Sequence, residues 1–377
     1  FAAGAVYTVT KTADTNDGVC DSDCSLREAI AAANATADND FIVFSSLFNT
    51  PQTITLASGE LVAANNGSLT IFGPGADKLT LSGNNASRIF SSGGNVVVTL
   101  SNLRFTAGNG AGALNTGRGG AIYNVGGTMT VNNSVITGNT ANTGGALNNA
   151  ASTGPAVNAN LTINNCHIFN NSSTSSGGAM QNFSTSTVTI INSTINNNTS
   201  GGSTGGGAIQ ANGTLSIANS TFANNNAPGG SGGAITFNGT AINFNNVTMI
   251  GNTATNNGGG FHRTGANPVT FRNTIISGNN GTAASPDITG AITSNGNNII
   301  GNIGTSSGWV MSDLQNTNPD VTPLGFYGGT GLSFAPYAGS PALNGGQNCV
   351  TDLTCAANNP PVALNRDQRG ASRRRKC

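Results

Sequence analysis

Charge is scarce in this chain. Only 7% of the 377 residues are Asp, Glu, Lys or Arg, and the formal net charge is zero. A neutral surface does not attract nucleic acid or an anionic membrane electrostatically, so we expect neither as a partner. The basic cluster Arg373–Lys376 is interpreted as a solvated tail.

The scarcity of carboxylates also limits catalytic chemistry. Neither Asp nor Glu occurs in residues 78–286. A calcium-dependent lyase needs carboxylates for its ion and a cationic base, and a glycoside hydrolase needs a pair of Asp or Glu. We therefore expect this long central segment to be non-enzymatic and without a metal or cofactor.

Three basic side chains are the remaining catalytic candidates: His262, Arg263 and Arg272. A histidine base and an arginine that neutralises a uronate would support metal-free elimination. This alternative would be strengthened by a cleft that joins them to Asp287 or Asp313. We interpret the His262–Arg263 pair instead as a surface feature without a catalytic role.

Long apolar runs and aromatic residues are also missing. The sequence begins without Met and has no apolar run of about twenty residues, so we expect a processed N-terminus and no membrane-spanning segment. One Trp and four Tyr provide few aromatic planes for sugar recognition.

A repeat fills the central chain. An apolar-x-apolar pair is followed two residues later by Asn, and from Asn165 onward the step is 27 residues. The apolar residues alternate with period two among Gly, Asn, Ser and Thr, which indicates strands rather than helices. Such a period predicts a parallel β-solenoid. Stacked amides would then form an Asn ladder along the column Asn102, Asn133, Asn165, Asn192, Asn219, Asn246 and Asn273.

Other columns accompany this ladder. A second Asn recurs at Asn139, Asn171, Asn198, Asn225, Asn252 and Asn279. Gly-Gly pairs such as Gly144-Gly145 fit tight corners with positive φ. Cys166 occupies a column of Ser and Thr, so we interpret it as a small stacked side chain rather than a nucleophile.

An outward Thr column includes Thr99, Thr130, Thr162 and Thr189. An ice-binding array is one interpretation of it. The neighbouring outward column is mixed, however, and ordinary β-propensity is the simpler explanation.

The repeats resemble those of polymorphic outer-membrane proteins and related β-helical adhesins. The resemblance rests on Gly-Gly-Ala-Ile together with Phe-x-x-Asn, as in Phe222-Ala-Asn-Asn225, and it covers roughly half of the chain. It implies a β-helical fold and a surface role.

The N-terminal segment predicts a short helix that closes the first coil. Ser25 and Glu28 fit a capping box. The run Cys24–Ala29 resembles the CSLREA-type N-terminal domain of secreted bacterial β-helix proteins, which implies export. In that setting Cys20 and Cys24 are expected to form a disulfide, whereas zinc would need further ligands that the neighbouring sequence lacks.

The C-terminal region is irregular. Gly339–Asn344 and Asp367–Gly370 resemble the C-terminal region of surface proteins with a choice of anchor. Cys349 and Cys355 are close enough in sequence for a second disulfide. Cys377 is left over, as a free thiol or an intermolecular link.

These observations predict a single right-handed parallel β-helix of the all-β class. Its expected parts are an N-terminal strand and capping helix (1–40), the β-helix (41–304) and an irregular C-terminal region (305–377). We expect a secreted, non-enzymatic bacterial fibre subunit or surface adhesin. It would self-associate through its ends or faces, or bind a cell-surface glycan or protein. The alternative is an extracellular polysaccharide-binding protein or polysaccharide lyase.

Overall fold

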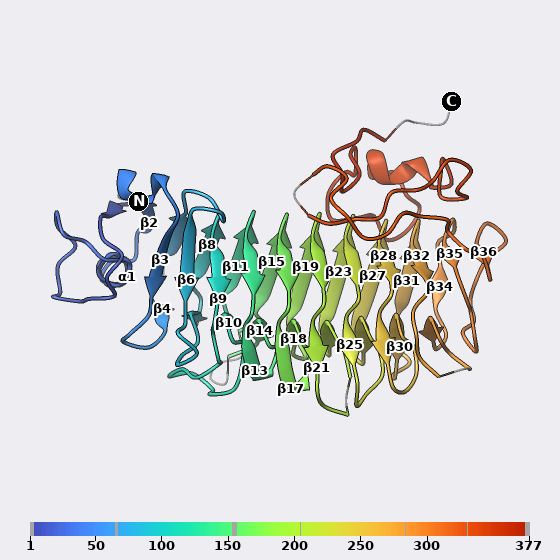
Figure 1. Cartoon of the computed structure of the whole chain (residues 1–377), viewed down its shortest axis with the longest axis horizontal. Coiled ribbons are helices and arrows are strands. Elements are labelled where there is room, and N and C mark those ends of the chain that lie inside the picture. Colours follow the sequence, from blue (N-terminus) through green and yellow to red (C-terminus); the bar gives the residue numbers. More distant parts are fainter. Residues whose placement is uncertain are drawn as a thin grey trace.

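The chain winds into a parallel β-solenoid, as predicted (Figure 1). The computed structural model describes residues 4–64, 67–152, 157–203, 205–282, 284–329 and 331–373. Within these ranges, the paired strands of the named sheets are all parallel, as in the pairing of β11 with β15. Residues 374–376 of the basic cluster and Cys377 lie outside the described ranges.

Two long sheets form two faces of the shaft. Sheet A has 11 strands: β1 (Val6–Val9), β2 (Asn39–Phe44), β5 (Ser68–Phe72), β8 (Val97–Ser101), β11 (Thr128–Asn132), β15 (Asn160–Asn164), β19 (Thr187–Ile191), β23 (Thr214–Ala218), β27 (Ala241–Asn245), β31 (Val269–Arg272) and β34 (Thr293–Ser294). Sheet B also has 11 strands: β3 (Gln52–Thr55), β6 (Leu79–Ser82), β9 (Arg104–Thr106), β12 (Val135–Thr137), β16 (His167–Phe169), β20 (Thr194–Asn196), β24 (Thr221–Ala223), β28 (Thr248–Ile250), β32 (Ile275–Ser277), β35 (Ile299–Ile300) and β36 (Leu314–Gln315).

Two further sheets complete the coils. Sheet C has 9 strands: β4 (Leu61–Ala63), β7 (Phe90–Gly93), β10 (Ile122–Val125), β14 (Leu147–Ala150), β18 (Met180–Asn182), β22 (Ile209–Ala211), β26 (Ile235–Phe237), β30 (Phe261–Arg263) and β33 (Ile288–Thr289). Sheet D has 5 short strands: β13 (Thr140–Thr143), β17 (Ser172–Ser176), β21 (Thr199–Ser200), β25 (Asn226–Ala227) and β29 (Thr253–Ala254). A central coil therefore passes through sheets C, A, B and D in that order.

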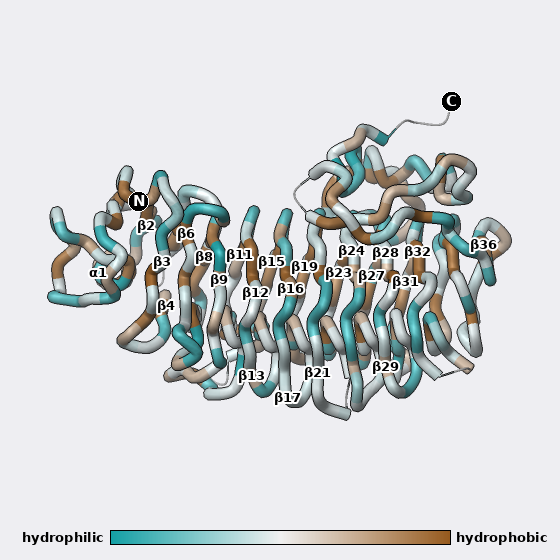
Figure 2. The backbone as a smooth tube through the Cα atoms, in the orientation of Figure 1, coloured by the Kyte–Doolittle hydropathy of each residue, from teal (hydrophilic) through white to brown (hydrophobic). Residues whose placement is uncertain are grey.

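The core lies inside the coils because each strand turns alternate residues inward. On sheet A, Met129 pairs with Leu161, and Leu161 pairs with Val188 in the next coil. All three are buried. Apolar segments consequently recur from coil to coil along the shaft (Figure 2).

The predicted Asn column forms the corner between sheets A and B. Each of its seven residues has a positive φ, between 48° and 60°. Asn tolerates this left-handed conformation better than most residues. Asn therefore recurs at this corner chiefly because the backbone there has a positive φ. Some side chains also bond along it: Asn165 donates to Asn133 over 2.6 Å, and Asn219 donates to Asn192 over 2.7 Å.

The second Asn column forms the continuous, buried ladder. Asn198 Oδ1 accepts from both the backbone N–H and the side-chain amide of Asn171, at 3.0 Å each. Asn198 in turn donates to Asn225 Oδ1 over 2.9 Å. The same contacts run from Asn139 to Asn279. The ladder that we expected at the A–B corner is therefore most complete at the following corner, because there the side chain points into the core.

The Gly-Gly pairs form the corner before sheet C. Gly144 has a φ of 60°, as the sequence predicts. At Gly145, a Cβ atom would lie 2.2 Å from the carbonyl oxygen of Gly178 in the next coil. The first glycine is thus required for its conformation and the second for the close approach of two coils.

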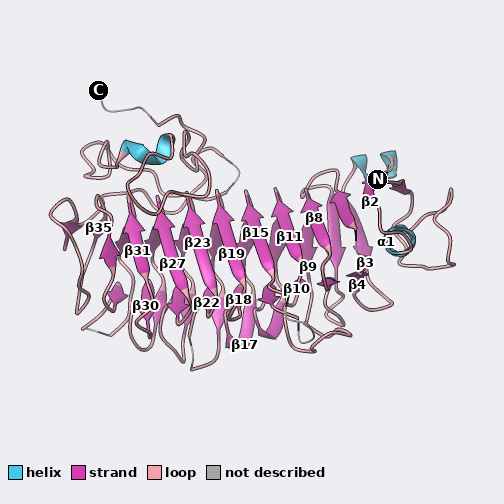
Figure 3. Ribbon diagram, turned by 180° about the vertical axis from the view of Figure 1, so that it is seen from behind, coloured by secondary structure: helices cyan, strands magenta, loops and turns pink. Residues whose placement is uncertain are grey.

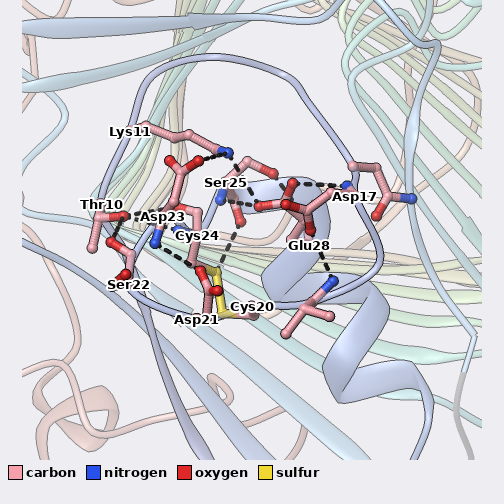
Figure 4. Close-up of a disulfide and its surroundings, with 12 residues drawn as sticks. Thr10, Lys11, Asp17, Cys20, Asp21, Ser22, Asp23, Cys24, Ser25 and Glu28 are labelled. Atoms are coloured by element: carbon pink, nitrogen blue, oxygen red, sulfur yellow. Dashed lines mark hydrogen bonds and ion pairs between the residues drawn. A yellow bond between two sulfur atoms is a disulfide. The ribbon is translucent and has the colours of Figure 1, made fainter.

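Helix α1 (Leu26–Asn34) closes the N-terminal end and packs against β1, β2 and β4. Its predicted capping box is present, with the Ser25 hydroxyl accepting from Glu28 N–H and Glu28 Oε2 accepting from Ser25 N–H. The Cys20–Cys24 disulfide lies beside it (Figure 4). A 3-10 turn, η1 (Ser46–Asn49), follows β2.

The strand pairing extends the β-helix beyond the expected bounds, residues 41–304, at both ends. β1 pairs with β2 and is therefore already a strand of sheet A. At the other end β36 pairs with β35, so the solenoid continues past residue 304. Trp309 packs against the core near this end, with its ring centroid 6.2 Å from that of Phe271. Residues 316–329 and 331–373, here called the strap, then fold back along the shaft and include the 3-10 turn η2 (Asn348–Thr351) (Figures 1 and 3).

Candidate functional site

The strap lies across the A–B corner in the C-terminal half of the shaft. Gln368 bridges two coils of sheet B: its Nε2 donates to Thr194 Oγ1 over 2.7 Å, and its Oε1 accepts from Thr221 Oγ1 over 2.6 Å. On the sheet A side, Arg272 donates to the carbonyl oxygens of Ala357 and Asn358, at 2.7 and 2.9 Å. The strap is thus fixed to both faces of the corner.

A small apolar cluster and a disulfide add to this attachment. Ala218 of sheet A packs with Val350 and Leu364 of the strap, and all three are buried. Cys349 and Cys355 pack against the cluster and form the second predicted disulfide. The cross-link holds the strap segment that contacts the shaft in a compact loop.

A cavity of about 220 Å³ lies between the strap and the shaft. Its floor includes the corner residues Asn219, Asn246 and Asn273, which belong to the predicted Asn column, and Thr248 of sheet B. Strap residues form the facing wall, among them Ser333, Phe334, Pro336, Asp367, Gln368, Arg369 and Arg373. A second hollow of about 150 Å³ shares Asn273 and Arg373 with it. The cavity therefore combines neutral polar groups of the repeat with charged groups of the strap.

Arg373 reaches from the strap onto this floor. Its Nη2 donates to Asn219 Oδ1 over 2.9 Å, and its Nε lies 3.4 Å from the carbonyl oxygen of Arg366. The Asn246 amide is oriented so that its oxygen faces the Arg373 guanidinium, and this oxygen lies 2.6 Å from Arg373 Nη1. Burial lowers the pKa of the Arg373 guanidinium from its ordinary value. Arg373 is therefore not the solvated side chain that the sequence suggested.

The other arginines held within the fold, Arg27, Arg88 and Arg272, have a charged partner or several carbonyl partners. Arg88 Nη1 lies 2.7 Å from Glu60 Oε2, and Arg27 Nε lies 2.7 Å from Asp14 Oδ1. In the cavity wall Arg369 pairs with Asp367. No carboxylate of the described residues lies within ion-pair distance of Arg373.

The three catalytic candidates do not form one site. His262 and Arg263 lie on β30 of sheet C, where His262 Nδ1 is 2.6 Å from Thr289 Oγ1 and Arg263 donates to the carbonyl of Ala291. Arg272 lies on β31 of sheet A and is 3% exposed beneath the strap. Its contacts are those of a side chain that fastens the strap.

The two carboxylates proposed to join them are acceptors at the ends of interior ladders. Asp287 Oδ1 accepts from the backbone and side-chain N–H groups of Asn279, at 2.7 and 2.8 Å. Asp313 Oδ1 accepts in the same way from Asn298. Burial raises the pKa of Asp287, although its hydrogen bonds oppose that shift. Each carboxylate continues the stack of acceptors by one coil beyond the last Asn.

Cys166 is buried and its thiol lies 3.4 Å from the carbonyl oxygens of Val131 and Asn164. Burial raises the pKa of this thiol to about 12, so little nucleophilic thiolate forms near neutrality. The described residues contain no cluster of His, Cys, Asp and Glu able to hold a metal. Within the same ranges, no helix is long and apolar enough to cross a membrane.

Arg373, Gln368 and Ser333 were not among the expected site residues. They lie in a segment without periodicity, so no column pointed to them. One signal was present in sheet A. The outward column that holds Asn132 and Asn164 changes to the buried, apolar Ile191 and Ala218 farther along, and Ala218 packs against the strap. It then returns to polar residues in coils that the strap also covers, so the signal is partial.

Comparison with protein-family models, curated proteins and solved structures found no match to this chain.

Proposed function

We propose that this protein is an extracellular, non-enzymatic adhesive rod that binds its partner at the strap cavity. The observation that carries the proposal is the cavity itself, which joins a rigid polar floor to a wall of strap residues. Neutral amides and hydroxyls on a rigid element recognise hydroxyl-rich ligands without the cost of desolvating many charges.

Export and bacterial surface display rest on several supporting features. Two disulfides fit an oxidising compartment. The run Cys24–Ala29, the Gly-Gly-Ala and Phe-x-x-Asn repeats, and the segments near Asn344 and Gly370 support a place among exported, right-handed β-helix proteins with a surface anchor. The resemblance and the disulfides point to the same location.

The covered N-terminal end favours an adhesin over a fibre subunit. Helix α1 covers one end of the core, whereas at the other end β36 pairs only with β35 among the described strands. Open strand edges would be needed for coils to stack head to tail between molecules. A fibre would instead require contacts along the faces of the shaft.

The arrangement of ionisable groups gives little support to the lyase alternative. His262 and Arg272 contact different segments, and Asp287 and Asp313 are occupied by ladder donors. A lyase would need a base and a charge-neutralising group around one substrate.

Negative-stain microscopy and glycan assays on the purified full chain would test this proposal. We expect separate rods with and without reductant, retention on acidic polysaccharide, and no release of unsaturated sugar product. Regular filaments would overturn the adhesin proposal in favour of a fibre. Product formation that His262→Ala abolishes would overturn the non-enzymatic assignment.

A further inference from the structure

We propose that the strap cavity is a binding site for a carboxylate-bearing sugar, a uronate unit of an acidic polysaccharide, with Arg373 as the carboxylate receptor. This inference rests on the proposed binding function and specifies its ligand class.

The first step concerns the contacts of the Arg373 side chain. Its guanidinium lies at the cavity wall, and the groups to which it donates, Asn219, Asn246 and the carbonyl of Arg366, are all neutral. Guanidinium groups match carboxylates because two N–H groups can donate in parallel to two oxygens. Asp367 acts on Arg373 only at longer range and pairs directly with Arg369. A carboxylate entering the cavity would supply the direct ion-pair partner that Arg373 lacks among the described residues.

The second step concerns the neighbouring polar groups. The Ser333 hydroxyl is buried, lines the cavity and has no hydrogen-bond partner among the described residues. Thr221 and Thr248 add hydroxyls on sheet B, and the corner amides add donors and acceptors. A buried polar group without a partner is costly, so a ligand hydroxyl that bonds Ser333 would be favoured.

The third step concerns shape and apolar surface. Phe334, Pro336 and Pro341 line the same cavity and offer apolar surface for the C–H face of a sugar ring. The volume of about 220 Å³ lies below the roughly 300 Å³ at which pockets for drug-sized ligands begin. It therefore suits one sugar unit, with the rest of the polymer outside.

An acidic peptide is the competing ligand. It shares the carboxylate but lacks the ring hydroxyls that the amide- and hydroxyl-lined floor would bond. The sugar is favoured because neutral polar groups line the cavity in larger number than charged ones.

The test is titration calorimetry of the full chain with trigalacturonate. The methyl ester of the same trisaccharide is the matched neutral probe. We expect trigalacturonate to bind at least tenfold more tightly than the ester, which corresponds to about 1.4 kcal/mol. Equal affinity for the two probes, or no binding of either, would overturn the proposal.

Arg373→Gln should weaken trigalacturonate binding at least tenfold and leave the weak affinity for the ester unchanged. Arg104→Gln is the matched control, because it removes one positive charge from sheet B outside the cavity. Thr248→Phe would fill the cavity floor while sparing Arg373, and we expect it to abolish binding. Unchanged affinity for trigalacturonate in both cavity variants would overturn the assignment of the cavity as the binding site.

Two outcomes separate this inference from the proposed function. Tight binding by oligoglutamate, competing with trigalacturonate at equal concentration, would overturn the sugar assignment but keep an adhesive rod. Cleavage of trigalacturonate by a protein that depends on Arg373 for binding would keep the site but overturn the non-enzymatic role. Circular dichroism of each variant checks that the shaft remains folded.

Discussion

Asn198 illustrates how single residues hold the shaft together. Its amide oxygen accepts two hydrogen bonds from Asn171, and its nitrogen donates to Asn225 and to two backbone carbonyls. All these groups are inside the core, where water does not replace a lost partner. The ladder therefore satisfies buried backbone groups and links neighbouring coils through the same hydrogen bonds.

We expect Asn198→Ala to lower the free energy of unfolding by at least about 2 kcal/mol, because two buried donors of Asn171 lose their acceptor. Urea unfolding followed by circular dichroism measures the change. Asn132→Ala is the control, since this outward residue makes only long side-chain contacts of 3.4 and 3.5 Å. Equal losses for both variants would contradict the role of the buried ladder.

The two histidines predict a dependence of stability on pH. Burial lowers the pKa of His167 and His262 below the ordinary value of 6.5. Between the lowered pKa and 6.5 the unfolded chain binds more protons than the folded chain. The free energy of unfolding should therefore fall as pH falls through this window.

Urea unfolding at several pH values between about 7.5 and 5 measures this slope. The double variant His167→Gln/His262→Gln should flatten it. If the slope persisted unchanged in that variant, groups other than the histidines would be responsible.

At the scale of elements, α1 depends on its cap. The Ser25 hydroxyl is buried, accepts from Glu28 N–H over 3.1 Å and donates to the carbonyl of Thr15 over 2.7 Å. Glu28 also accepts from the N–H of Asp17 and lies 3.5 Å from Lys11 Nζ. The capping box thus fixes the preceding loop as well as the helix, as Figure 4 shows.

We expect Ser25→Ala to destabilise the N-terminal cap by about 1–2 kcal/mol. Hydrogen exchange should rise in residues 10–38 and stay unchanged in the central coils, because solenoid units interact mainly with their neighbours. Ser22→Ala, at an exposed position in the same loop, should have no comparable effect. Faster exchange throughout the shaft would show that the cap controls more than its own end.

The whole molecule is a rod whose N-terminal end is covered by α1. Sheet A has 11 strands. At about 4.8 Å between neighbouring strands it spans roughly 48 Å. A shaft of this kind has two open ends by construction, and the cap segments determine whether it stays monomeric.

Deletion of residues 4–38 should remove β1 and the helix α1 that covers this end, and leave the edge of the longer strand β2 unpaired and uncovered. We expect concentration-dependent association of that variant in sedimentation velocity, because an unpaired strand edge accepts a strand from another molecule. The full chain at the same concentration should sediment as one elongated species. A folded deletion variant that stayed monomeric would contradict this role of the N-terminal cap.

The sequence alone determined the length of a coil and the positions that stack on one another, because stacked residues recur once per coil. It therefore predicted the parallel solenoid, the positive φ at Gly144, the capping box and both disulfides. The positive φ at Asn165 was not predicted, because the recurring Asn was interpreted only as a side-chain ladder. The side on which each Asn column lies followed only from the path of the backbone at each corner. The strap and its cavity depended wholly on tertiary structure. Arg373 and Asn219 meet across 154 residues, and a contact between a repeat and a non-repeating segment leaves no period in the sequence.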